Sequence, residues 1–147
     1  MSGVQKLEKA AAIALHVKLK EAMHVLFVGG GSVGHIAPAV AVWEELIKLQ
    51  PAATAHFVCS KRINDTVFLH ASRLPYTALQ TPRLGIAFLW KIWPALLRAK
   101  KILDEQQPSV VFSKGGYVSV PMCLMAWLRK IPIILHESDA VSGRANW

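Results

Sequence analysis

Cysteine is scarce in this 147-residue sequence, which contains only Cys59 and Cys123. The two are far apart and form no Cys-x-x-Cys pair, so neither a disulfide framework nor a thiolate zinc site is indicated. We therefore expect both residues to be buried free thiols, as in proteins of a reducing compartment.

Acidic residues are also few, since 9 Asp and Glu stand against 17 Lys and Arg, which gives a net charge of +8. This balance favours anionic partners such as nucleic acid, phosphorylated ligands or an acidic membrane surface. The sequence has no block of Lys and Arg with interleaved aromatic residues, so no nucleic-acid partner is predicted.

A long apolar run of the membrane-spanning kind is absent as well. The longest uncharged stretch, Ala22 to Trp43, contains three consecutive glycines and Pro38, whereas a spanning helix needs about 20 predominantly apolar residues. The first 22 residues are rich in Ala and Lys, and Lys18 and Lys20 interrupt the apolar core that a signal peptide needs. We predict an N-terminal extension helix over residues 1–22 and one domain over residues 23–147.

From Met23 onward, segments of strand type alternate with segments of helix type. The predicted strands are His24 to Val28, Ala55 to Cys59, Tyr76 to Leu79, Ser109 to Phe112 and Pro132 to Leu135. The predicted helices are Pro38 to Leu49, Ile63 to Ser72, Ile86 to Gln106 and Val118 to Lys130. This alternation predicts an α/β fold with a doubly wound, mainly parallel, Rossmann-like sheet. Ligands of such folds bind at the carboxyl ends of the strands, so the loops there are the candidate site.

The first of these loops is GGGSVGH, Gly29 to His35, between strand one and the first helix. Its glycines let the backbone approach a ligand, and amides at a helix N-terminus can face an anion. The loop does not match G-x-G-x-x-G, and strand two ends in FVCSKR without an acidic residue, so no nicotinamide cofactor is expected. His35 is either a helix-capping residue or a general base.

Two further loops carry unusual residues. SKGGYVSVP, which starts at Ser113, repeats the design of two glycines before a helix, and two such loops facing one cleft would suit a diphosphate. Tyr117 either packs beside the loop or contacts the ligand. LHESDAVSGRAN, which starts at Leu135, lacks the second His of an HExxH zinc site. His136 and Glu137 are therefore interpreted as a hydrogen-bonding pair, and no metal is expected.

GGGSVGHIAPAVAV, SKGGYVSVP and IPIILHES, in this order and near these separations, resemble the N-terminal half of the MurG family. The resemblance covers about residues 23–147. It implies the N-terminal domain of a GT-B glycosyltransferase that moves N-acetylglucosamine from UDP-N-acetylglucosamine to lipid I with inversion, forming lipid II of peptidoglycan. In that family the N-terminal half holds the lipid-linked acceptor, and a C-terminal donor-binding domain, which this sequence lacks, binds most of the UDP. No cofactor is implied.

The resemblance also implies roles for single residues, with His35 as the general base. The implied donor-binding residues are Ser32, Val33, Gly34 and Asp139, and the implied acceptor-binding residues are Gly30, Gly31, Gly115, Gly116, Tyr117, His136 and Glu137. Two of these depart from the family pattern, because Val33 stands in place of a glycine and Asp139 in place of an amide. A β-branched residue is costly where positive φ is required, and a carboxylate repels a diphosphate.

The stretch RLGIAFLWKIWPALLRAKK, Arg83 to Lys101, combines aromatic and basic residues and contains no acidic residue. Aromatic side chains flanked by cations suit a bilayer interface with anionic lipids, and the alternative is a core helix with a basic solvent face. We expect Phe88, Trp90 and Trp93 to contact an anionic membrane. With the family's lipid substrate, this predicts a peripheral protein on the cytoplasmic face of the bacterial membrane.

Two functions remain open from the sequence. One is the acceptor-binding half of a MurG-like transferase, which is inactive until joined to a donor-binding domain. The other is a non-catalytic, membrane-recruiting subunit similar to that of the split eukaryotic transferase. The GGY and HES loops favour the first.

Overall fold

The computed structural model describes residues 23–31, 33–82 and 88–136, without the side chains of residues 33, 35, 88, 89 and 91. The predicted extension helix over residues 1–22 lies outside this part of the chain, as do three candidate site residues, Ser32, Glu137 and Asp139.

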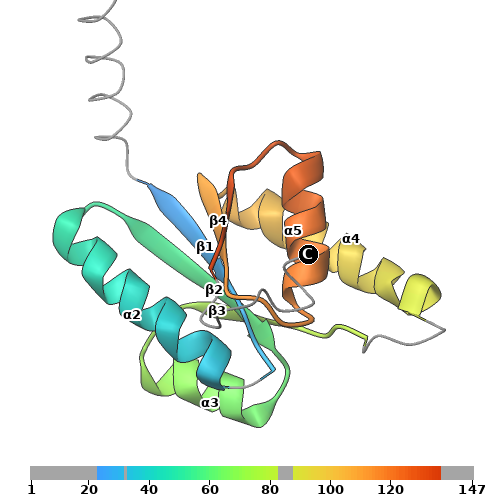
Figure 1. Ribbon diagram of the computed structural model, residues 1–147, viewed down its shortest axis with the longest axis horizontal. Helices are drawn as coiled ribbons and strands as arrows, with labels where there is room; N and C mark the ends of the chain where they lie inside the picture. The colour runs from blue at the N-terminus through green and yellow to red at the C-terminus, as the bar shows by residue number, and fades with distance from the viewer. Residues whose placement is uncertain (1–22, 32, 83–87, 137–147) are drawn as a thin grey trace, which may run out of the picture.

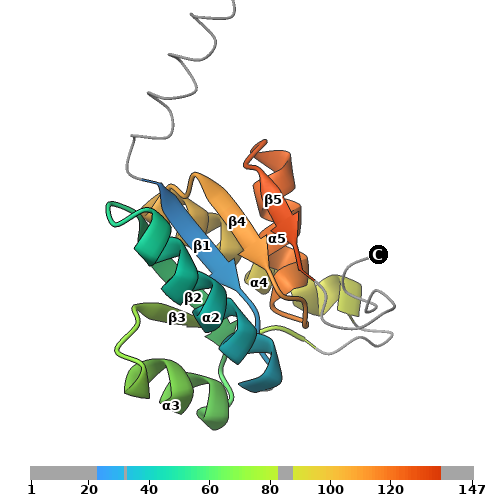
Figure 2. The ribbon, with the colours of Figure 1, turned by 60° about the vertical axis from the view of Figure 1, so that its left-hand side comes forward.

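Five parallel strands form one sheet (Figures 1 and 2). They are β1 (His24–Val28), β2 (Thr54–Ser60), β3 (Tyr76–Leu79), β4 (Val110–Ser113) and β5 (Ile133–Leu135). Their order across the sheet is β3-β2-β1-β4-β5, and each neighbouring pair is parallel. The predicted parallel, doubly wound sheet is confirmed. The strand order reverses between β1 and β4, which makes this pair the switch point where such folds bind ligands.

Helices cover both faces of the sheet. Helices α2 (Val33–Leu49) and α3 (Ile63–Ala71) lie on one face, and α4 (Phe88–Gln106) and α5 (Ser119–Leu128) lie on the other (Figures 1 and 2). Side chains of β1 alternate between the two faces, as the pleat of a strand requires. Phe27 packs in the cluster with α2 and α3, whereas Leu26 and Val28 pack in the cluster with α4 and α5. A strand buried on both sides is therefore continuously apolar.

Helix α2 begins at Val33, five residues before the predicted start at Pro38. The prediction placed proline at the first turn, where its missing N–H costs nothing. The fixed φ of proline is itself helical, so one further turn can precede it at the cost of a hydrogen bond to the Gly34 carbonyl. Val33, Gly34 and His35 therefore belong to the first turn of α2 and not to the loop. The strain expected at Val33 does not arise, because its backbone is helical.

The other predicted elements are present with small shifts. Strands β1 and β3 have the predicted bounds, and the remaining described ends lie within one or two residues of the predicted ones, as is usual at the ends of elements. Within residues 23–31, 33–82 and 88–136, no helix combines the length and apolar character needed to cross a bilayer.

Candidate functional site

The two glycine loops meet at the carboxyl ends of β1 and β4. Gly116 has a φ of 86°, and a Cβ built on it would lie 2.4 Å from the carbonyl oxygen of Gly30. The Lys114 N–H donates to the Val28 carbonyl at 2.8 Å, so the ladder between β1 and β4 continues to the start of the second loop. The structure thus brings the two loops together at the switch point of the sheet.

The first loop is anchored to Asp65, which lies in the first turn of α3. The Gly31 N–H donates to Asp65 Oδ2 at 2.8 Å, and the Ser60 hydroxyl donates to the same oxygen at 2.5 Å. The Gly31 carbonyl, which belongs to the next peptide group, accepts a hydrogen bond from Arg62 Nη1. Both polar groups of Gly31 are therefore bonded within the protein. An anion at this loop has to be held by other donors.

Asp65 is fully buried, and its Oδ1 has no hydrogen-bond partner among the described residues. A buried carboxylate is costly unless hydrogen bonds compensate it, so the bonds from Gly31 and Ser60 matter for this loop. Space is also tight at Gly30, where a Cβ would lie 2.6 Å from the Ser60 backbone nitrogen. Sequence reasoning missed Asp65, because an acidic residue in the first turn of a helix is commonplace.

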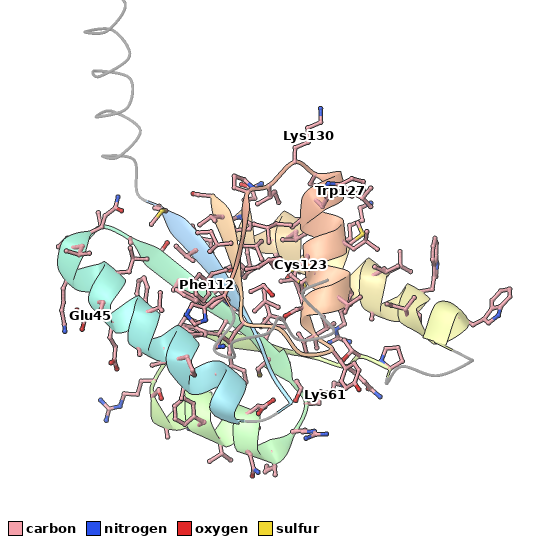
Figure 3. All side chains as sticks on the ribbon, in the orientation of Figure 1. Glu45, Lys61, Phe112, Cys123, Trp127 and Lys130 are labelled. Carbon is pink, nitrogen blue, oxygen red and sulfur yellow. The ribbon has the colours of Figure 1, made fainter. Side chains whose placement is uncertain are left out.

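A cavity of about 330 Å³ opens beside these loops, at the carboxyl ends of β1, β2 and β3. Its wall includes Gly30 and Gly31, the cations Lys61 and Arg62, and Tyr117, together with Ser60, Leu79, Gln80, Thr81 and Val118. Lys61, labelled in Figure 3, donates from Nζ to Gln80 Oε1 at 3.3 Å across the cavity wall. Three candidate acceptor residues, Gly30, Gly31 and Tyr117, therefore share one cavity with two cations that the sequence analysis did not propose as site residues.

The remaining described candidates do not line this cavity. Gly115 has a φ of 91°, and its carbonyl accepts a hydrogen bond from the Ser119 hydroxyl at 2.8 Å. Gly34 is exposed in the first turn of α2. His136 follows β5, where its N–H donates to the Ser113 carbonyl at 2.8 Å.

The imidazole of His136 packs on the ring of Phe112, which Figure 3 labels, with ring centroids 5.6 Å apart. Phe112 belongs to the apolar cluster beneath α2, so His136 lies on the α2 side of the sheet. Its Nδ1 is buried and has no partner among the described residues. The predicted pairing with Glu137 lies outside them. His136 thus has one buried ring nitrogen without a hydrogen-bond partner in the described part of the chain. Its side chain does not line the cavity.

Helix α4 exposes an apolar face that consists of Trp90, Trp93 and Leu97, with Trp90 87 % exposed and Trp93 65 % exposed. Phe88 begins the helix, but its side chain is outside the described residues. The neighbouring helix α5 exposes Trp127, labelled in Figure 3. Sequence reasoning missed Trp127 because an apolar helix does not reveal which of its faces the sheet covers.

Both cysteines are free, as expected. Cys59 is buried, whereas Cys123 is only half-buried. Burial raises the pKa of the Cys59 thiol to about 12, with a smaller contribution from the Asp65 charge, and burial also raises the pKa of Cys123. Thiols with raised pKa values are poor nucleophiles. Across the described ranges, no group of three or more His, Cys, Asp or Glu side chains is placed to hold a metal ion.

The sequence pattern of the glycosyltransferase family 28 N-terminal domain matches residues 25–147. The chain is 32 % identical over 129 residues to the UDP-N-acetylglucosamine--N-acetylmuramyl-(pentapeptide) pyrophosphoryl-undecaprenol N-acetylglucosamine transferase of Clostridium perfringens strain 13. It is 34 % identical over 129 residues to the transferase of the same name from Clostridium botulinum strain Alaska E43. Each alignment covers 83 % of this chain and 36 % of the relative. The chain thus spans about a third of the length of these curated relatives.

Among solved structures, the MurG of Acinetobacter baumannii matches with a TM-score of 0.72 and 27 % identity, over 84 % of this chain and 37 % of that one. The UDP-GlcNAc 2-epimerase of Neisseria meningitidis matches with a TM-score of 0.56 and 18 % identity, over 77 % of this chain and 32 % of that one. The second likeness concerns the fold alone, and the fold is that of a GT-B domain. The resemblance to MurG is confirmed, and the chain belongs to the glycosyltransferase family 28 N-terminal domain family.

Proposed function

We propose that this chain is the acceptor-binding half of an inverting glycosyltransferase that moves N-acetylglucosamine from UDP-N-acetylglucosamine to lipid I, forming lipid II. The observation that carries the proposal is the meeting of the two glycine loops at the switch point between β1 and β4. Ligands of open α/β sheets bind in this crevice. The names of the curated relatives supply the chemistry, because they are N-acetylglucosamine transferases that act on a pyrophosphoryl-undecaprenol acceptor.

In this proposal His35 is the general base that deprotonates the acceptor hydroxyl. Its backbone lies in the first turn of α2, directly after the first glycine loop. The positive end of the helix dipole favours a neutral imidazole, and only the neutral form can accept a proton. The acceptor contacts Gly30, Gly31, Gly116 and Tyr117 beside the cavity, together with Gly115, His136 and Glu137. Ser32, Val33, Gly34 and Asp139 contact the donor.

The proposal also places this domain against an anionic membrane surface, as a peripheral protein on the cytoplasmic face. Trp90 and Trp93 project from α4, and the exposed cations Arg98, Lys100 and Lys101 follow on the same helix. Aromatic rings with neighbouring cations suit the headgroup region of such a bilayer. The donor-binding domain is a further partner. The membrane-recruiting subunit is the less favoured function, because the curated relatives are themselves transferases.

A chimeric enzyme tests the proposal. Residues 23–147 replace the matching segment of the Clostridium perfringens transferase, and turnover is measured with UDP-N-acetylglucosamine and a soluble lipid I analogue. We expect turnover by the chimera and none by the 147-residue chain alone. His35→Ala in the chimera should lower kcat by roughly 10²–10⁴-fold, the usual contribution of a positioned base, with little change in the acceptor KM.

His70→Ala is the matched control, because His70 is an exposed histidine on α3. It should leave both kinetic constants unchanged. A chimera that folds and binds UDP but shows no turnover would favour the membrane-recruiting subunit instead. If His35→Ala raises only the acceptor KM, then His35 binds the acceptor and another residue is the base.

A further inference from the structure

We propose that Lys61 and Arg62 form a diphosphate-binding site in the cavity at the end of β2, and that this site holds the diphosphate of the lipid-linked acceptor. The two residues directly follow β2, and both line the cavity of about 330 Å³. This volume is within the range of small-ligand pockets. The identity of the ligand rests on the proposed function, whereas the binding of a diphosphate does not.

The two cations approach the cavity from different sides. Arg62 Nη1 donates to the Gly31 carbonyl of the β1 loop, and Lys61 Nζ donates to Gln80 Oε1 after β3. These bonds fix both side chains along the wall of the cavity. A guanidinium has five N–H donors and an ammonium has three, so each keeps donors for a ligand after its bond to a neutral acceptor.

Neither cation is neutralised by a carboxylate of the described residues. The ion pairs there join other side chains, Lys48 to Glu45, Lys101 to Glu105 and Arg129 to Asp104. The nearby carboxylate of Asp65 is fully buried and accepts from Gly31 and Ser60. Two cations on one cavity wall therefore offer a positive field that matches the charge of a diphosphate.

The N–H groups of Gly29 and Gly31 in the first loop are bonded within the protein, to the Val58 carbonyl and to Asp65, so neither is free to hold this anion. The Gly31 N–H is directed to Asp65 and its carbonyl is held by Arg62. Lys61 and Arg62, which directly follow β2, therefore supply the donors that glycine amides supply in many phosphate loops. Tyr117, from the second glycine loop, is 44 % exposed and lines the same cavity.

A diphosphate can come from the acceptor or from the UDP of the donor, and the other residues of the cavity favour the acceptor. Gly30, Gly31 and Tyr117, which the proposed function assigns to the acceptor, line the same cavity as the two cations. The curated relatives are named for a pyrophosphoryl-undecaprenol acceptor.

Calorimetric titration of inorganic pyrophosphate into the 147-residue chain tests the site. We expect the wild-type chain to bind, and Lys61→Gln and Arg62→Gln each to weaken the affinity roughly tenfold, the effect of losing one hydrogen bond to a charged group. Lys130→Gln is the matched control, because Lys130 is an exposed lysine at the opposite end of the molecule (Figure 3). It should change the affinity by less than about twofold. Circular dichroism checks that each variant is folded.

The source of the diphosphate is tested by titrating farnesyl diphosphate and UDP in the same way. Both cavity variants should weaken the binding of farnesyl diphosphate, and neither should affect UDP. If wild type does not bind pyrophosphate, or if Lys130→Gln weakens binding as much as Lys61→Gln, the site is refuted. If only UDP binding responds, the assignment to the acceptor is wrong. An active chimera whose acceptor KM does not change with Lys61→Gln overturns the assignment to the acceptor while the proposed function stands. Pyrophosphate binding together with an inactive chimera supports the site and contradicts the proposed function.

Discussion

At the scale of single residues, the two glycine loops need glycine for different reasons. Gly31 has a φ of 103° but open space where a Cβ would lie, so only its backbone conformation excludes other residues. Gly116 combines a φ of 86° with a would-be Cβ 2.4 Å from the Gly30 carbonyl oxygen. The contact between the loops therefore depends on position 116 more than on position 31.

This difference gives a pair of substitutions that serve as controls for each other. Gly31→Ala should lower the free energy of unfolding by about 1–2 kcal/mol, the cost of a positive φ. Gly116→Ala should lower it by about 3 kcal/mol or more, because the overlap with Gly30 adds to that cost. Urea unfolding curves of both variants measure the difference. Equal losses would mean that the loops do not touch as described.

At the scale of elements, α4 is amphipathic with an unusual outer face. Ile92, Ala95 and Ala99 are buried, whereas Trp90, Trp93 and Leu97, at i, i+3 and i+7 spacing, are exposed. Two exposed tryptophans on one face are more than isolated surface apolar residues, so we expect this face to be an interaction surface. Its basic neighbours favour an anionic bilayer as the partner.

Co-sedimentation with vesicles tests this surface. The chain should bind anionic vesicles more tightly than neutral ones, and added salt should weaken the binding. Trp90→Ser with Trp93→Ser should weaken it by tenfold or more, since burying one such side chain contributes about 1.5–3 kcal/mol. Ile63→Ser, on α3 at the other face of the sheet, removes a comparably exposed apolar side chain and should have little effect. If the chain does not bind vesicles, or if salt does not weaken the binding, the alternative is supported, in which α4 is a core helix with a basic solvent face.

At the scale of the whole molecule, we expect His56 to couple pH to folding. His56 lies half-buried on β2 and bonds through Nε2 to the Thr77 hydroxyl of β3 at 2.8 Å. Burial, with a smaller contribution from the charge of His24, lowers the pKa of His56 below 6.5. The unfolded chain therefore takes up a proton more readily than the folded one. The stabilising contribution is complete above about pH 6.5 and is lost as pH falls below that value.

We expect the free energy of unfolding to fall between about pH 7.5 and about pH 5, and His56→Gln to reduce this fall. A glutamine retains a donor and an acceptor for Thr77 but does not titrate. Urea unfolding at several pH values measures the slope, with His70→Gln as the variant that removes an exposed histidine instead. If the free energy of unfolding of His56→Gln falls with pH as steeply as that of the wild type, then other groups cause the loss of stability in acid.

The sequence by itself determined the layout of this protein. The apolar run at His24–Val28 predicted its strand with the observed bounds, because a strand buried on both faces is continuously apolar. The edge strand Tyr76–Leu79 is only partly buried and was predicted from its strand-type residues. The glycines of the two loops were found for a similar reason, since backbone freedom is a property of the residue. The motif order even identified the family, because short segments with fixed spacing carry that information.

Only the tertiary structure decided what these loops contact. The bond between Gly31 and Asp65 joins residues 34 apart in the chain, and no local pattern encodes which helix will lie beneath a loop. The exposure of Trp127 depends on which side of α5 packs against the sheet and α4. Lys61 and Arg62 appeared in the sequence only as the absence of an acidic residue after β2. They became a candidate anion site because parallel strand order brings the ends of β1, β2 and β3 to one edge, where their charges face a common cavity.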